Sequence, residues 1–269
     1  MDWSLVPLFV ALGLIVGFLA GLLGIGGGMT MVPVLTMVFA AKGFPPDHLV
    51  HMAVATSTAT IIFTALSSIR AHHARGAIRW PIVAAIAPGI VLGSLAGPQF
   101  AALLSTAVLA FVFGAFNWFS AWQMLVDRKP AAHREMPGAL ATSAVGAGIG
   151  FVSALVGAGG GFLSVPFMTW CNVKIHNAVA TSAAIGLPIA VAGTIGYVVA
   201  GSRQDGMPPL TAGYIYLPAL AAIVVASVLT APLGARTAHA WPVGKLKKAF
   251  AALLFVLGAY MFWKAWSVR

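Results

Sequence analysis

The sequence predicts an all-α polytopic membrane protein made of two inverted-topology repeats of about five hydrophobic segments each. The first observation is composition: 60% of the 269 residues are hydrophobic and 7% are charged, whereas a soluble domain carries about 25% charged residues. The second is that several apolar runs reach the roughly 20 residues that span a bilayer as a helix. The third is an internal duplication of glycine-rich and threonine-serine motifs.

The duplication is clearest in two pairs of motifs that recur in the same order. The stretch "GFLAGLLGIGGGMTMVP" at 17–33 aligns without gaps on "GFVSALVGAGGGFLSVP" at 150–166. The stretch "HMAVATS" at 51–57 then matches "HNAVATS" at 176–182. We therefore expect two homologous transmembrane halves.

The halves are predicted to cover residues 1–126 and 139–269, joined by the polar connector "DRKPAAHREMPG" at 127–138. Hydrophobic runs separated by Gly, Pro and charged residues define the expected helices of each half. In the first half these are 5–23, 29–41, 48–69, 81–99 and 104–126, and in the second they are 138–156, 162–173, 176–200, 212–235 and 244–266.

Segments 29–41 and 162–173, each of which follows a glycine cluster, are too short to cross the membrane. Thirteen helical residues rise only about 20 Å, and the hydrocarbon core is about 30 Å thick. Each segment is therefore either one half of a broken spanning helix or the return arm of a re-entrant hairpin. The hairpin puts the 15 Lys and Arg residues on one side with four exceptions, which are Lys42, Arg203, Lys264 and Arg269.

The broken helix divides the basic residues more evenly, so the positive-inside rule favours the hairpin. Both termini are then expected outside the cytoplasm, the 127–138 connector is cytoplasmic, and the halves have opposite orientations. Inverted repeats of this kind are typical of secondary transporters.

The glycine clusters predict an anion site at the starts of the two short helices. Irregular backbone at membrane depth is tolerated where it lines a cavity or is buried in protein, and a helix start offers unpaired N–H groups and a positive dipole end. Close helix packing is the alternative use of such glycines. The candidate binding residues here are Gly26, Gly27, Gly28, Met29 and Thr30, with Gly159, Gly160, Gly161 and Phe162 in the second half.

The AVATS motifs are expected to reach the same depth, so that their hydroxyls assist binding. The candidates are Thr56, Ser57, Thr181 and Ser182. Hydroxyls in membrane helices also bond back to their own backbone, which is the alternative for each. The paired His51 and His176 lie nearer the surface, as packing residues, caps or protonatable gates.

The charge pattern excludes several other functions. All acidic residues, namely Asp2, Asp47, Asp127, Glu135 and Asp205, fall in predicted loops or ends, whereas cation and proton exchangers keep a carboxylate within the membrane. The net charge of +10 comes from basic residues scattered among loops, which disfavours nucleic acid as a partner. The single Cys171 excludes an internal disulfide and a multi-cysteine metal site, and we expect no cofactor or metal.

The motifs resemble those of the TauE/SafE sulfite exporter family, also called the toluene-sulfonate uptake permeases. The likeness rests on "GLLGIGGGMTMVPVL", "ALVGAGGGFLSVPFM" and the paired "AVATS" stretches, and covers nearly the whole chain. It implies a multi-pass transporter of the bacterial inner membrane that moves sulfite, sulfonates and related anions. It leaves the direction of transport open, because the family includes exporters and uptake systems.

We thus expect a secondary transporter of small anions that works by alternating access. Two alternatives remain open: an anion channel on the same scaffold, and a membrane-embedded redox or enzyme subunit. The second is disfavoured because the chain has no nucleophile–base pair of recognisable spacing and no intramembrane carboxylate.

Overall fold

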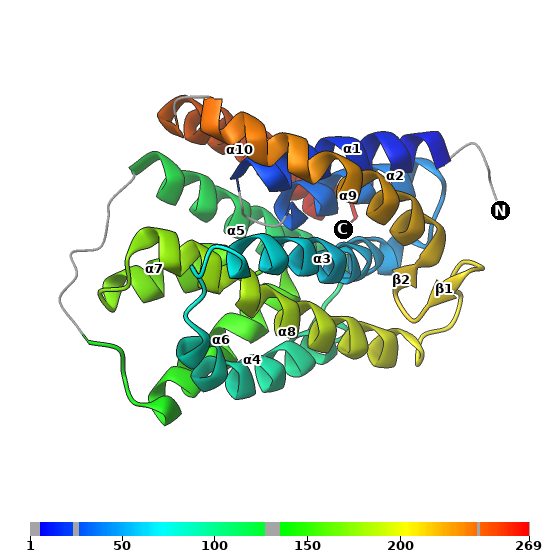
Figure 1. Ribbon diagram of the computed structural model, residues 1–269. Coiled ribbons are helices and arrows are strands. Elements are labelled where there is room, and N and C mark those ends of the chain that lie inside the picture. The colour runs from blue at the N-terminus through cyan, green and yellow to red at the C-terminus, as the bar shows by residue number, and fades with distance from the viewer. Residues whose placement is uncertain (1–5, 24–26, 127–134, 241–242, 269) are drawn as a thin grey trace.

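The computed structural model describes residues 6–23, 27–126, 135–240 and 243–268, and within them the chain forms ten α-helices and one short β-hairpin (Figure 1). The elements of the first half are α1 (Val6–Leu23), α2 (Gly28–Ala41), the 3₁₀ turn η2 (Pro46–His48), α3 (Leu49–His73), α4 (Trp80–Ala101) and α5 (Thr106–Val126). Those of the second half are α6 (Ala139–Leu155), α7 (Gly161–Trp170), α8 (Ile175–Gly201), β1 (Thr211–Ala212), β2 (Ile215–Tyr216), α9 (Leu217–Ala240) and α10 (Val243–Ser267).

The all-α membrane fold is confirmed. Each predicted segment is a helix, and five of the described helices, α3, α4, α5, α8 and α10, are long and apolar enough to cross a bilayer. One boundary was wrong: the segment expected to start at residue 212 begins with the β1–β2 hairpin, in which Thr211 pairs with Tyr216, and the helix starts only at Leu217. Residues 127–134 of the connector lie outside the described part of the chain.

Helix α2 folds back along α1. The ring of Phe9, in the first turn of α1, lies 6.4 Å from the ring of Phe39 near the end of α2. A broken helix that continued across the membrane would carry these two rings apart. The first half therefore has the hairpin geometry, with α2 (14 residues) as its short return arm.

The two halves are packed into each other. Helix α1 packs on α9 of the other half, and its counterpart α6 packs on α4, which is the counterpart of α9. Helices α3 and α8, which carry the two AVATS motifs, pack together, as do α5 and α10. The contacts between the helices thus follow the duplication in the sequence.

The counterpart helices α5 and α10 run in opposite directions. Along α5, Phe111 contacts Phe262 of α10 at 5.3 Å between ring centroids, and Trp118 contacts Phe255 at 5.9 Å. Residue numbers therefore rise along α5 as they fall along α10. Antiparallel counterparts are what inverted repeats predict; the orientation of the chain in a bilayer stays a prediction.

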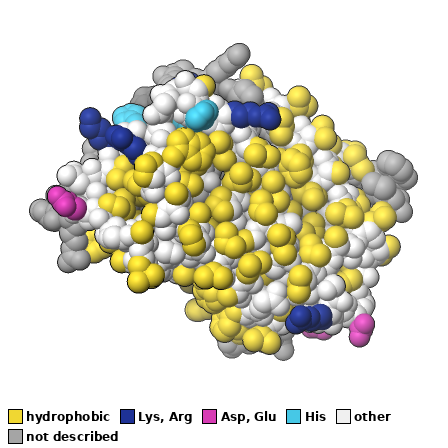
Figure 2. Space-filling model, turned by 60° about the horizontal axis from the view of Figure 1, so that its bottom comes forward, with side chains coloured by type: hydrophobic (Ala, Val, Ile, Leu, Met, Phe, Trp, Pro, Cys, Tyr) yellow, Lys and Arg dark blue, Asp and Glu magenta, His cyan; other side chains and the backbone are white. Residues whose placement is uncertain are grey.

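Helix α3 lies at the centre of the bundle, between α1, α9 and α10 above and α4, α6 and α8 below in Figure 1. In the most apolar 18-residue stretch of Pro46–His73, which contains α3, 78% is buried, whereas the corresponding share for α4 is 33%. One face of the molecule carries a broad apolar surface, with charged side chains gathered toward its edges (Figure 2). This surface is suited to contact with lipid, so a polar site is expected among the central helices, away from the lipid.

Candidate functional site

The two short helices begin in the same way, directly after a glycine in the left-handed conformation. Gly27 has φ 64° at the start of α2, and Gly160 has φ 76° at the start of α7. Glycine adopts this conformation without the steric cost that a Cβ imposes. Neither helix start has a side-chain cap, so no N-cap side chain accepts from the N–H groups of the first two residues of each helix.

The glycine cluster of the second half rests on the start of α2. A Cβ atom built on Gly28 would overlap the carbonyl oxygen of Gly157. The same carbonyl accepts a hydrogen bond of 3.3 Å from the Ser57 hydroxyl. The two clusters, far apart in the sequence, therefore meet inside the molecule, as the inverted repeat predicts. Gly26 lies outside the described residues.

A serine of each AVATS motif lies beside the start of one of the two short helices, α2 and α7, which are called half-helices below. A Cβ built on Gly28 would lie 3.2 Å from the Ser57 oxygen, and one built on Gly161 would lie 3.4 Å from the Ser182 oxygen. Ser182 also accepts a hydrogen bond of 2.9 Å from Ser164 of α7. A Cβ on Gly159 would lie 3.7 Å from Ile61 of α3, so the second cluster also contacts the first half.

The threonines serve mainly the protein's own backbone. The Thr56 hydroxyl accepts a hydrogen bond of 3.1 Å from the N–H of Tyr216, and Thr181 accepts one of 3.0 Å from the N–H of Arg79. Each bond joins the third helix of one half to the residue before the fourth helix of the other. The Thr30 hydroxyl donates to the carbonyl of Gly27, 2.8 Å away in its own turn.

Residues at the start of α2 make a contact that the sequence did not indicate. The side-chain amide of Asn117 in α5 donates to the carbonyl of Met29 over 3.3 Å. The side-chain oxygen of Asn117 is buried and has no partner among the residues that the structure describes. The sequence shows Asn117 as a polar residue within an apolar segment, which could have indicated a buried contact. The second half has Met261 at the matching position, so the repeat does not indicate a polar role for Asn117. Phe162, the second residue of α7, is buried.

The paired histidines have different surroundings. His51 is buried, and its Nε2 lies 2.9 Å from the Ala101 carbonyl and 3.1 Å from that of Leu104, so Nε2 carries the proton. The ring stacks on Tyr214 of the hairpin at 5.3 Å. His176 is exposed at the start of α8. A gating role stays a prediction for both residues.

The described α-helices carry no acidic side chains. Nor does any group of three His, Cys, Asp or Glu among the described residues come together as metal ligands would. Near the starts of α2 and α7, backbone N–H and hydroxyl groups can donate hydrogen bonds, and such donors suit an anion.

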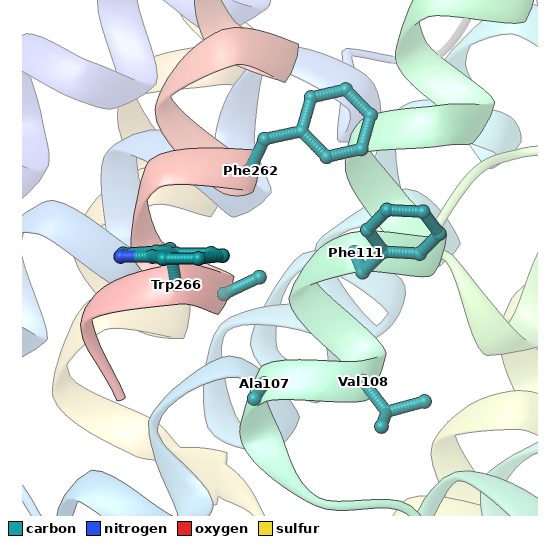
Figure 3. Close-up of a pocket in the computed structure, with 6 residues that line it drawn as sticks. Ala107, Val108, Phe111, Phe262 and Trp266 are labelled. Carbon is teal, nitrogen blue, oxygen red and sulfur yellow. The ribbon is translucent and has the colours of Figure 1, made fainter. Parts of the chain in front are cut away.

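A pocket elsewhere is unsuited to that chemistry. It lies between α5 and α10, where Phe111 and Phe262 come from facing helices (Figure 3), and has a volume of about 440 Å³. Its lining consists of Ala107, Val108, Phe111, Phe262, Ala265 and Trp266. Phe111 is 57% exposed and Trp266 76% exposed, so the pocket is an apolar groove on the outer surface.

Comparisons with known proteins identify a family and several relatives of the chain. Residues 9–261 match the family described as Sulfite exporter TauE/SafE. A probable membrane transporter protein of Haemophilus influenzae is 35% identical over 97% of this chain and all of its own length. A probable membrane transporter protein of Methanocaldococcus jannaschii is 29% identical over 96% of this chain and 95% of its own.

A third similar protein, the probable membrane transporter YdhB of Bacillus subtilis, is 26% identical over 90% of this chain and 94% of its own. No solved structure matches the chain. The family match covers both glycine clusters, both AVATS motifs and all or part of every helix. The chain therefore belongs to the TauE/SafE sulfite exporter family and is a multi-pass membrane transporter.

Proposed function

We propose that the chain is a secondary transporter of small oxyanions, with sulfite, sulfonates and related sulfur-containing anions as the substrate class, in the bacterial inner membrane. The observation that carries the proposal is the presence of two uncapped helix starts, those of α2 and α7, with the start of α2 in contact with the second glycine cluster at Gly157. Helix starts combine unpaired N–H groups with a positive dipole end, and transporters use such starts to hold anionic groups near the midplane. The family's description supports sulfur oxyanions in particular.

The surroundings support an anion over a cation. No described α-helix brings a carboxylate into the bundle, and Ser57 and Ser182 each stand beside a half-helix start as neutral hydroxyl groups. A cation at either helix start would meet the positive end of a helix dipole. Binding by neutral donors also avoids burying a Lys or Arg, which costs free energy unless the charge is paired.

Alternating access is supported by the exchange of contacts between the halves. Thr56 bonds Tyr216, and Thr181 bonds Arg79, at equivalent positions. Both threonines lie toward the start of their helix, and α3 and α8 are counterparts in halves whose helices run in opposite directions. The two bonds then belong to opposite sides of the bundle, and opening one while the other stays closed would give an anion access from one side at a time.

Counterflow in proteoliposomes tests the proposal. Vesicles loaded with unlabelled sodium sulfite should take up trace labelled sulfite, and protein-free vesicles should not. Saturable uptake that depends on internal sulfite supports a carrier. Large unitary currents without counterflow would indicate an anion channel, and absence of any anion flux, for sulfite, methanesulfonate and acetate alike, would overturn the proposal.

A further inference from the structure

Ser153 is a buried hydroxyl that the function described so far does not use. It lies in α6 and is 1% exposed, and its oxygen has no hydrogen-bond partner within the part of the chain that the structure describes. Serine and threonine side chains in apolar helices commonly bond to a carbonyl of their own helix, as Thr36, Thr58 and Thr60 do here. A buried hydroxyl without a partner loses hydration without compensation, so the burial of this hydroxyl needs an explanation.

The Ser153 hydroxyl is directed at the start of α7. A Cβ built on Gly160, the residue before α7, would lie 3.4 Å from the Ser153 oxygen. Ser182 of α8 lies beside the next residue, because a Cβ on Gly161 would be 3.4 Å from its oxygen. One hydroxyl from α6 and one from α8 therefore stand at adjacent residues of the same helix start.

Ser182 is arranged to donate. Its oxygen already accepts the hydrogen bond from Ser164, 2.9 Å away, and its own proton has no acceptor among the described residues. Hydrogen bonds in a chain polarise one another. The Ser164–Ser182 pair thus presents a strengthened O–H donor beside Gly161.

The backbone at this helix start adds further donors. The N–H groups of Leu163 and Ser164 bond to the carbonyl of Gly160 at 3.1 and 2.8 Å. The N–H groups of the two preceding residues, Gly161 and Phe162, donate to no acceptor within the described residues. Two hydroxyls and two N–H groups, all uncharged, therefore have no acceptor among the described residues.

The start of α2 differs in sequence and in structure. At the positions matching Ser153 and Ser164 the first half has Ala20 and Met31. The remaining serine, Ser57, donates to the carbonyl of Gly157, and that carbonyl lies against Gly28. A protein oxygen therefore already stands where an anion would approach α2.

From this contrast we infer that the transported oxyanion binds asymmetrically, at the start of α7, held by the Ser153 and Ser182 hydroxyls and the N–H groups of Gly161 and Phe162. The inference rests on the proposed function. The donors come from three helices, α6, α7 and α8, at two adjacent residues of one helix start, which suits a small pyramidal or tetrahedral head group with several acceptor oxygens. Ile149 and Ile189 lie beside Gly160 and limit its size.

The test is the dissociation constant of sodium sulfite for the full-length purified protein, measured by titration calorimetry. Ser153→Ala and Ser182→Ala should each weaken binding by about tenfold or more, as expected when a hydrogen bond to a charged ligand is lost. Ser153→Thr keeps the hydroxyl and should bind more tightly than Ser153→Ala. The matched control is Ser120→Ala, which removes another buried hydroxyl without a partner, from α5, and should leave the dissociation constant within about twofold.

The outcomes separate this inference from the proposed function. A wild-type protein that binds neither sulfite nor methanesulfonate overturns both. Wild-type binding that Ser153→Ala leaves unchanged, in a variant with unchanged melting temperature, overturns the inference alone. Equal losses for Ser57→Ala and Ser182→Ala would mean that the two half-helix starts share the ion, and would overturn the assignment to α7. If Ser153→Ala does not fold, Ser182→Ala with Ser153→Thr decides the same question.

Discussion

Replacing Gly28 with alanine inserts one methyl group where the two glycine clusters meet. Gly28 is the first residue of α2 and does not have a positive φ, so the backbone itself tolerates alanine. The obstacle is the Gly157 carbonyl, which the new Cβ would overlap. A carbonyl is part of the main chain and cannot rotate away as a side chain can, so one loop must move.

The cost can be worked from two contacts. Forcing an extra methyl into a packed interior costs about 1–3 kcal/mol. Moving Gly157 also weakens its hydrogen bond from Ser57, which contributes about 1 kcal/mol. Gly28→Ala should thus lower the free energy of unfolding by about 2–4 kcal/mol. At roughly 2–4 °C per kcal/mol for chains of this size, the melting temperature should fall by about 4–16 °C.

The assay is thermal unfolding of the purified protein in detergent, followed by intrinsic tryptophan fluorescence. The matched control is Gly148→Ala in α6, where a Cβ would meet nothing within 4 Å. That change should be neutral or stabilising by up to about 1 kcal/mol, because alanine is the better helix former. Equal melting temperatures for Gly28→Ala and wild type would refute the close contact between the clusters.

Three further predictions follow from other contacts. Thr56→Val and Thr181→Val each leave a backbone N–H without its acceptor and should cost about 1–3 kcal/mol of stability, whereas Thr58→Val, which loses only a bond within α3, should cost less in the same melts. Asn117→Leu removes the hydrogen bond to Met29 but also removes an unpaired buried oxygen. The free energy of unfolding, measured in the same melts, should therefore change by no more than about 1 kcal/mol. A larger loss of stability would mean that the Asn117 amide has a further partner. A cysteine at Ala132, in a Cys171→Ala background, should resist an impermeant thiol reagent in intact cells, because the distribution of basic residues predicts a cytoplasmic connector; rapid labelling would reverse the topology.

The fold was largely predictable because its strongest signals are local. The glycine clusters put the starts of the short helices at residues 29 and 162, one residue from the observed Gly28 and Gly161. The β1–β2 hairpin was not predicted, since "TAGYIY" is apolar enough to continue the helix that follows. What separates the hairpin from α9 is packing: Tyr214 of its turn lies against His51 and Tyr197.

The site was predictable in its backbone and less so in its side chains. Periodicity and depth bring the AVATS motifs near the glycines, but they do not say which way a hydroxyl faces. Thr56 and Thr181 meet backbone N–H groups of the opposite half, a contact between distant segments that no local pattern encodes. The repeat does not mark Ser153, because the first half has Ala20 at the matching position. Duplication predicts what the halves share, and an asymmetric site depends on where they differ.

The location of a bound oxyanion tests the account most directly. Selenite is shaped like sulfite and carries an anomalous scatterer, so crystals of the wild-type protein grown with selenite would mark the site at the selenium edge. The account predicts one interior peak within hydrogen-bonding distance of the Ser153 and Ser182 hydroxyls and the N–H groups of Gly161 and Phe162. A peak in the apolar groove between α5 and α10, or only among the basic loops, would contradict it.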